Sequence, residues 1–205
     1  IAAFRGEEVE AEGLYRQALE IARKMGDREG EAATLICLGA LASLSGDLEK
    51  MESFTREALA IHRETGHREG EAAALHNLGA GLCNREEYDE ARNLFQQSIA
   101  INREIGFTEG IGRSLTRLGV VAHLQEDLPG AEALFREALE ITREVGDRES
   151  ELLCMRNLAS IAMVHGDSEE AESLLKGWIR TSIEIGSPLE DWMVENGMAE
   201  NLDSE

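Results

Sequence analysis

Apolar residues recur along this chain three and four positions apart, which is the spacing of helices that bury one side. Between residues 106 and 127, Leu115, Leu118 and Ala122 form such a stripe. Between residues 127 and 146, a second stripe consists of Leu134, Ala138, Ile141 and Val145. The two stripes predict a pair of helices, a first and a second, that are joined near residue 127.

This pair of stripes belongs to a repeat with a period of 40 residues. Leucine followed by a small residue recurs every 40 residues, at Leu38-Gly39, Leu78-Gly79, Leu118-Gly119 and Leu158-Ala159. Glycines recur at the same interval, at Gly26, Gly66, Gly106, Gly146 and Gly186. Chance does not hold one register at so many positions, so the chain is predicted to be an array of helix pairs.

Glycine and aspartate mark the ends of the expected helices. Gly46-Asp47 separates a first helix from a second, and Gly26-Asp27 separates a second helix from the next first helix. Glycine favours the left-handed conformation that ends a helix, and aspartate caps the helix that follows. Gly39 and its equivalents lie inside a helix instead, where glycine costs about 1 kcal/mol. Their recurrence predicts that a neighbouring helix approaches closely there.

The array predicts one continuous domain over residues 1–205, because no linker interrupts it. It begins with a partial repeat, 1–26, which contains the end of a first helix at Ile1–Phe4 and a second helix that ends near Met25. It ends with a capping helix over 187–205. The four full repeats between them are expected at 27–66, 67–106, 107–146 and 147–186. The start inside a helix indicates a fragment of a larger protein.

Composition restricts the function of such an array. The formal net charge is −21, and only 20 of the 205 residues are Lys or Arg, which argues against binding to nucleic acid. No apolar stretch reaches the length of a membrane span. Cys37, Cys83 and Cys154 are too widely spaced for a zinc motif or a disulfide framework. We therefore expect a cytoplasmic protein, and the preference for arginine over lysine indicates a bacterial source.

No arrangement of side chains predicts catalysis. His62 and His67 lie in a segment that superficially resembles a zinc-protease helix, but its glutamate is misplaced and Gly66 interrupts the helix. We interpret both histidines as exposed polar residues. His76 and His123 have no carboxylate or cysteine at the spacing of metal ligands. The sequence therefore predicts no enzyme, no cofactor and no metal site.

The residues that keep the register also match a known repeat. Leu35-x-x-Leu38-Gly39-x-x-Ala42 resembles the first helix of the tetratricopeptide repeat, and Ala91-x-x-x-Phe95 and Ala131-x-x-x-Phe135 resemble its second helix. The longer period is similar to the repeats of kinesin light chains, Leu-Gly-Asn adaptors and bacterial signalling-ATPase regulators. The resemblance implies a right-handed α-α superhelix of antiparallel helix pairs, whose first helices line a concave groove.

The resemblance also implies where a partner would bind. With Leu115 and Leu118 in the core, the outward side of that first helix carries polar and basic residues, and adding or subtracting 40 gives the equivalents in other repeats. The N-terminal half of this groove is small and apolar, whereas the C-terminal half is basic. The row of Asn77, Arg117 and Asn157 resembles the amide row with which long-period relatives hold an extended peptide. The candidate binding residues are His76, Asn77, Arg113, Thr116, Arg117, His123, Arg156 and Asn157.

These residues predict a non-catalytic module that binds a peptide or partner helix in its groove. Arginine pairs with carboxylates through its two-pronged guanidinium, so an acidic or carboxylate-bearing partner is expected. Alternatively, Arg113, Arg117 and Arg156 only neutralise neighbouring carboxylates such as Glu109 and Glu149. Two other functions stay open: a ligand-sensing domain of a signalling ATPase or transcriptional regulator, and a scaffold that associates with itself.

Overall fold

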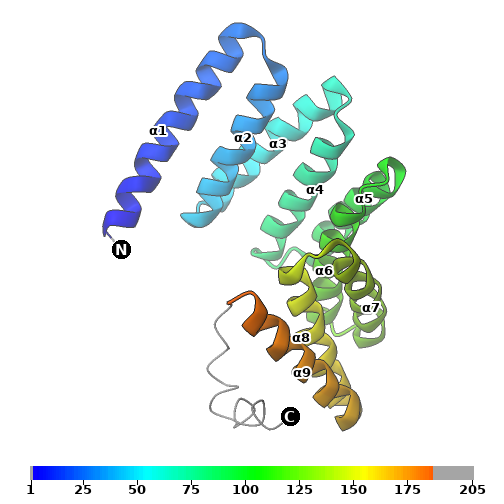
Figure 1. Cartoon of the computed structure of the whole chain (residues 1–205). Helices are drawn as coiled ribbons and strands as arrows, with labels where there is room; N and C mark the ends of the chain where they lie inside the picture. Colours follow the sequence, from blue (N-terminus) through cyan, green and yellow to red (C-terminus); the bar gives the residue numbers. More distant parts are fainter. Residues whose placement is uncertain (1, 187–205) are drawn as a thin grey trace. The chain divides into compact units, whose positions relative to one another are not determined.

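The computed structural model of the chain describes the backbone of residues 2–186 and the side chains from Val9 onward within that range. The capping helix expected over 187–205 lies outside the described residues, as does Ile1. The described part consists of nine helices joined by short turns, and it contains no strand (Figure 1). The predicted all-α class is therefore confirmed.

Even-numbered helices are the first helices of the expected pairs, and odd-numbered helices are the second. Their bounds are α1 (Ala2–Met25), α2 (Arg28–Leu44), α3 (Leu48–Thr65), α4 (Arg68–Cys83), α5 (Tyr88–Ile105), α6 (Thr108–Leu124), α7 (Leu128–Val145), α8 (Arg148–His165) and α9 (Ser168–Glu184).

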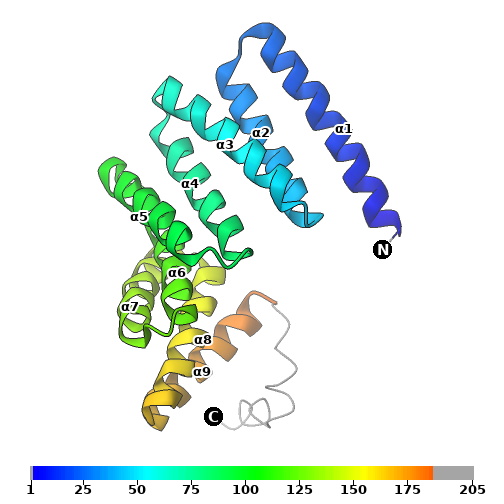
Figure 2. The same cartoon turned by 180° about the vertical axis from the view of Figure 1, so that it is seen from behind.

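The chain forms two compact units, residues 1–114 and 115–205, which divide within α6. In the first unit, α2 packs antiparallel to α3, and α4 packs antiparallel to α5 (Figures 1 and 2). In the second unit, α8 contacts both α7 and α9. Each unit is therefore built from packed helix pairs, while the expected single domain and its repeat boundaries stay a prediction.

The turns follow the prediction from glycine and aspartate. The glycines at the helix ends, among them Gly26 and Gly46, all have positive φ, between 66° and 78°. The Asp27 carboxylate accepts a hydrogen bond from the backbone N–H of Gly30, at 2.9 Å, and Asp47 does the same for Lys50, at 3.1 Å. These bonds satisfy backbone donors that have no partner inside the helix, so they fix where α2 and α3 begin.

The first helix differs from the prediction. The expected break after Phe4 is absent, and Ala2–Met25 is one continuous helix. Glu7 takes the position that Asp47, Asp127 and Asp167 occupy later in the chain, but Glu87 takes it too, and α5 begins directly after Glu87. The residue type at this position therefore does not explain why the first helix continues.

The close approach predicted at the glycines inside helices is confirmed. A Cβ atom at Gly79 would lie 2.9 Å from the ring of Phe95, and one at Gly119 would lie 2.8 Å from the ring of Phe135. Both rings are fully buried. Helices α5 and α7 therefore each insert a phenylalanine into a gap that glycine opens in the preceding first helix, whereas Gly39 of α2 faces Thr55 of α3.

The predicted stripe of the first helix is confirmed, and that of the second helix is wrong by a small rotation. Leu115, Leu118 and Ala122 are buried, whereas Val145 in α7 is 38% exposed and Leu134 and Ile141 are only half-buried. Phe135 decides the orientation of α7, because its ring must enter the gap at Gly119. The buried face of α7 consists of Ala131, Phe135, Ala138, Leu139 and Thr142.

Replacing Gly119 by alanine is expected to destabilise the chain by about 1 kcal/mol. The crowding against Phe135 costs about 2 kcal/mol, of which the better helix propensity of alanine recovers about 1 kcal/mol. Gly13 is the matched control, because it lies in α1 with nothing within 4 Å of an added Cβ. Gly13→Ala is expected to stabilise the chain, so urea unfolding should shift in opposite directions in the two variants. A shift in the same direction would contradict this account of packing.

Candidate partner-binding surface

Each first helix exposes the same row of positions. In the first unit, Ala33 and Ala40 are exposed on α2, and Ala73 and Asn77 are exposed on α4. In the second unit, Arg117 is exposed on α6, with Asn157 half-buried at the equivalent position of α8. The row is small and apolar at the start of the chain and polar further on, as the sequence predicts.

Two of the candidate residues, His76 and Arg113, have partners within the first unit. The Nδ1 atom of His76 lies 3.0 Å from the Oγ atom of Ser114, and its ring packs edge-on against Phe95 at 5.5 Å between centroids. Arg113 is exposed and pairs with Glu109, one turn earlier in α6. The neutralising role considered for the arginines therefore holds for Arg113.

The candidate arginines of the second unit, Arg117 on α6 and Arg156 on α8, are both exposed. Arg117 forms no ion pair with any described residue. Asn157 donates a hydrogen bond from Nδ2 to the carbonyl oxygen of Leu153, at 2.7 Å, which occupies part of the amide that was expected to hold a peptide. His123 is half-buried, and its Nδ1 atom makes no hydrogen bond within the described part of the chain.

Thr116 does not lie on the outward surface as expected. It is 2% exposed, and its hydroxyl lies 3.4 Å from the sulfur of Cys154 on the next first helix. His76 makes the same kind of contact with Ser114, also 38 residues further along the chain. His76 and Thr116 therefore each face the neighbouring first helix, which a stripe on a single helix does not reveal, whereas Arg156 at the equivalent position of α8 is exposed.

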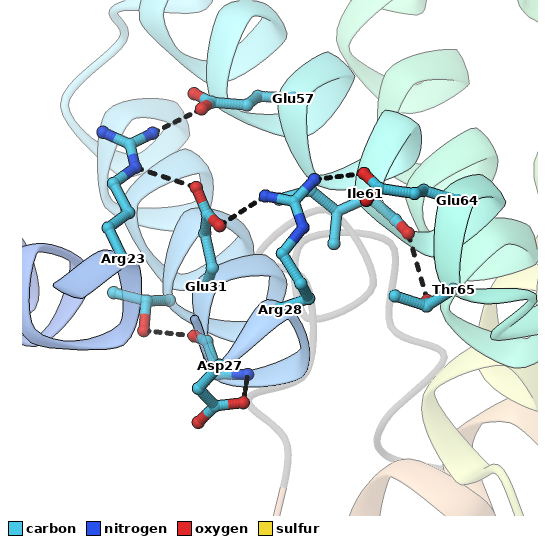
Figure 3. Close-up of polar contacts among 10 residues, drawn as sticks. Arg23, Asp27, Arg28, Glu31, Glu57, Ile61, Glu64 and Thr65 are labelled. Carbon is cyan, nitrogen blue, oxygen red and sulfur yellow. Dashed lines mark hydrogen bonds and ion pairs between the residues drawn. The ribbon is translucent and has the colours of Figure 1, made fainter. Parts of the chain in front are cut away.

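A buried cluster of one glutamate and two arginines, which was not expected from the sequence, lies at junctions between repeats. Glu31 is 6% exposed, and its carboxylate accepts hydrogen bonds from Arg23 of α1, at 2.8 Å, and from Arg28, at 2.5 Å (Figure 3). The same two arginines reach Glu57 and Glu64 of α3. We call a buried glutamate between two arginines a triad, and this one connects three helices.

The triad occurs three times among the described residues. Glu71 accepts from Arg63 and Arg68, at 2.8 and 2.5 Å, and Arg68 also pairs with Glu104 at 2.6 Å. In the second unit, the triad consists of Glu151, Arg143 and Arg148. The signal was present in the sequence as Glu31, Glu71 and Glu151 in the 40-residue register, but position 111 is isoleucine and interrupts it.

The triads change the pKa values of their glutamates. Hydrogen bonds from Arg23 and then Arg28 lower the pKa of the Glu31 carboxyl, although burial opposes them. Burial alone would raise the pKa of Glu71, but Arg63 and Arg68 together outweigh it, and the net shift is downward. Both glutamates are therefore ionised at neutral pH, and they hold the helix pairs together.

His62 and His67 are not the pair of exposed residues that the sequence predicts. His62 is buried near the end of α3, and His67 occupies the N-cap position of α4, where it makes no capping hydrogen bond. Their Nδ1 atoms lie 3.2 Å apart. Burial, followed by the neighbouring His67, lowers the pKa of His62, so His62 is neutral in the folded chain.

The described part of the chain shows neither a metal-binding cluster nor a membrane-spanning helix. No group of three or more His, Cys, Asp or Glu side chains in the described part of the chain is placed to hold a metal ion. No helix among the described residues is long and apolar enough to cross a membrane. The exposed rows of the first helices therefore remain the main candidate surface.

Packed helix pairs in a 40-residue register, with a glycine facing a phenylalanine in two of them, define an α-helical repeat protein. A model of the tetratricopeptide repeat family matches residues 30–104 and 110–176, which is more than half of the chain. The chain therefore belongs to the tetratricopeptide repeat family, as predicted. Proteins of this family bind proteins or peptides and are typically non-catalytic scaffolds.

Solved structures confirm this architecture. BtubC from P. vanneervenii is 21% identical, with a TM-score of 0.78, and the match covers 92% of this chain and 78% of BtubC. A signal transduction ATPase with a tetratricopeptide repeat sensor, from Pyrococcus horikoshii, is 23% identical with a TM-score of 0.72, over 94% of this chain and 29% of that protein. Aspartyl phosphate phosphatase F from Bacillus subtilis is 16% identical, with a TM-score of 0.76, and the match covers 84% of this chain and 45% of that protein. No curated protein matches the chain.

Proposed function

We propose that the chain is a non-catalytic interaction module that binds an acidic or carboxylate-bearing peptide through the exposed rows of its first helices. Arg117 carries the proposal. It is exposed on α6 without an ion pair among the described residues, whereas most of the described arginines pair with a carboxylate. In a chain of net charge −21, an arginine that no carboxylate neutralises is available to one from outside.

Arg156 of α8 extends the proposed contact, because it is exposed in the same unit. Two guanidinium groups can each form a paired hydrogen bond with a carboxylate, and such charge-assisted bonds are stronger than neutral ones. We place Asn157 beside them as a contact for the peptide backbone through its carbonyl oxygen, since its Nδ2 already donates to Leu153. His76 and Thr116 are left out of the contact, because both face a neighbouring first helix.

The double substitution Arg117→Glu and Arg156→Glu is expected to weaken peptide binding by roughly ten-fold or more, because two charge-assisted contacts become repulsive. Fluorescence anisotropy with labelled random decapeptides that contain four glutamates measures the loss. The same peptides with glutamine in place of glutamate should bind weakly to both proteins.

The double substitution Lys176→Glu and Arg180→Glu provides the matched control, because both residues are exposed on α9, a second helix, and the change in net charge is the same. Binding should be nearly unchanged in this variant. Equal losses of peptide affinity in the control and in the Arg117→Glu, Arg156→Glu variant would show that net charge alone governs binding. The proposed surface would then be wrong.

A second candidate is a ligand-sensing domain of a larger bacterial regulator. Its support is the likeness to the signal transduction ATPase whose tetratricopeptide repeats are described as a sensor. If the chain is a sensor, its metabolite should raise the melting temperature of the chain by mass action.

Self-association stays a prediction, which the sedimentation mass of the chain tests. A cytoplasmic location belongs to the same proposal and is supported by Cys37, Cys83 and Cys154, none of which forms a disulfide.

A further inference from the structure

Two histidine side chains meet at the turn between α3 and α4, away from the proposed peptide surface. The Nδ1 atoms of His62 and His67 lie 3.2 Å apart, and the rings are edge-on with centroids 5.0 Å apart. His62 is 7% exposed, whereas His67 is exposed to solvent. The two ring nitrogens therefore lie within hydrogen-bond distance of each other, and the His67 side of the pair is open to solvent.

Helix capping does not explain this pair. The position of His67 is aspartate at Asp27 and Asp147, where the carboxylate caps the following helix. His67 makes no such hydrogen bond. The position of His62 is Asn102 in the next repeat, so the pairing of two imidazoles occurs at this one junction among the described residues.

The distance between the two nitrogens matches that between two ligands of one metal ion. Imidazole nitrogens bind zinc at about 2.0–2.1 Å, so two of them at a tetrahedral ion lie about 3.3 Å apart. Zinc, nickel and copper ions all accept neutral imidazole. The carboxylates of Glu29 and Glu71 act electrostatically on His62, although Glu71 already pairs with Arg63 and Arg68.

We propose that the Nδ1 atoms of His62 and His67 together bind one divalent transition-metal ion of the zinc, nickel or copper type. Both ligands come from this turn, and the described residues supply no third His, Cys, Asp or Glu at the site. Water or a group of a bound partner completes the coordination through the exposed side of His67. The ion joins the end of α3 to the start of α4, where the aspartate cap is missing.

Isothermal titration of the whole chain with nickel chloride or zinc chloride, in a buffer without chelating agents, tests the proposal. One ion per chain should bind, and the melting temperature should rise with metal concentration by mass action. Both effects should disappear in H67F and in H62N. These substitutions introduce residues that the chain itself carries at Phe107 and Asn102, so the fold is expected to persist, which circular dichroism checks.

His165→Asn is the matched control, because His165 is an exposed histidine on α8 in the other unit. Nickel binding should be unchanged in this variant. If either variant of the pair fails to fold, the imidazole signals in the nitrogen-15 spectrum of the unmodified chain still decide, since zinc should shift those of His62 and His67 and leave that of His165. Absence of binding, or equal binding in H67F, would overturn the proposal.

Discussion

Phe95→Ala is expected to lower the free energy of unfolding by about 3–5 kcal/mol, the largest effect of any substitution considered for this chain. The ring of Phe95 is fully buried, lies in the gap that Gly79 opens in α4, and packs edge-on against His76. Removing it takes away a large apolar surface and leaves a cavity that two rigid helices cannot close.

Urea unfolding followed by circular dichroism measures the effect. Leu14→Ala is the control, because Leu14 is 60% exposed in α1 and its truncation should cost far less. A second comparison is sharper. Gly79→Ala should be unfavourable alone but nearly neutral in the Phe95→Ala background, where the cavity receives the new methyl group. Additive effects of the two substitutions would show that Gly79 and Phe95 do not pack as described.

The second large effect is expected at the triad of Glu71. Glu71→Gln keeps the shape of the side chain but removes the charge that two arginines share, and we expect a loss of about 2 kcal/mol. The loss is smaller than for a fully buried ion pair, because Arg63 and Arg68 are about half exposed and can turn toward water.

The effect should depend on pH. The pKa of Glu71 is lowered in the folded chain, so ionised Glu71 stabilises the fold fully above the ordinary carboxyl pKa. This contribution is lost as the pH falls through the lowered pKa. The difference in stability between the original chain and Glu71→Gln should therefore be largest near pH 7 and shrink steadily below about pH 4.5. A difference that is constant from pH 7 to pH 3 would contradict the role assigned to this charge.

The chain offers its own control for the triad. The third repeat has Thr108 and Ile111 where the second has Arg68 and Glu71. The double variant Arg68→Thr and Glu71→Ile copies that repeat, replaces part of the ionic cluster with an apolar contact, and should be more stable than Glu71→Gln alone.

The fold was largely predictable because its causes are local and repeated. A register of 40 residues, glycines at helix ends and aspartate caps each act within one or two turns of helix, so the sequence displays them directly. The break expected after Phe4 is absent, and the residue type does not account for this, because Glu7 and Glu87 stand at equivalent positions and α5 begins directly after Glu87.

The binding surface was less predictable, because its geometry depends on neighbouring helices. The stripe of one helix identifies a buried face but not the second helix that covers the next face, so Thr116 was placed on the surface although it contacts Cys154. The orientation of α7 depends on one ring, that of Phe135, which enters a gap in another helix. Arg117 was predicted from its position alone, and it is exposed.

The exposed row of the first helices also has a consequence for engineering. Asn77 and Arg117 stand at equivalent positions, and both are exposed on helices that the buried rows hold in place. Changing such a residue alters what the helix can recognise and leaves the interior intact. Specificity could then be rewritten one module at a time, by exchanging a few side chains in each, while the scaffold that presents them stays the same.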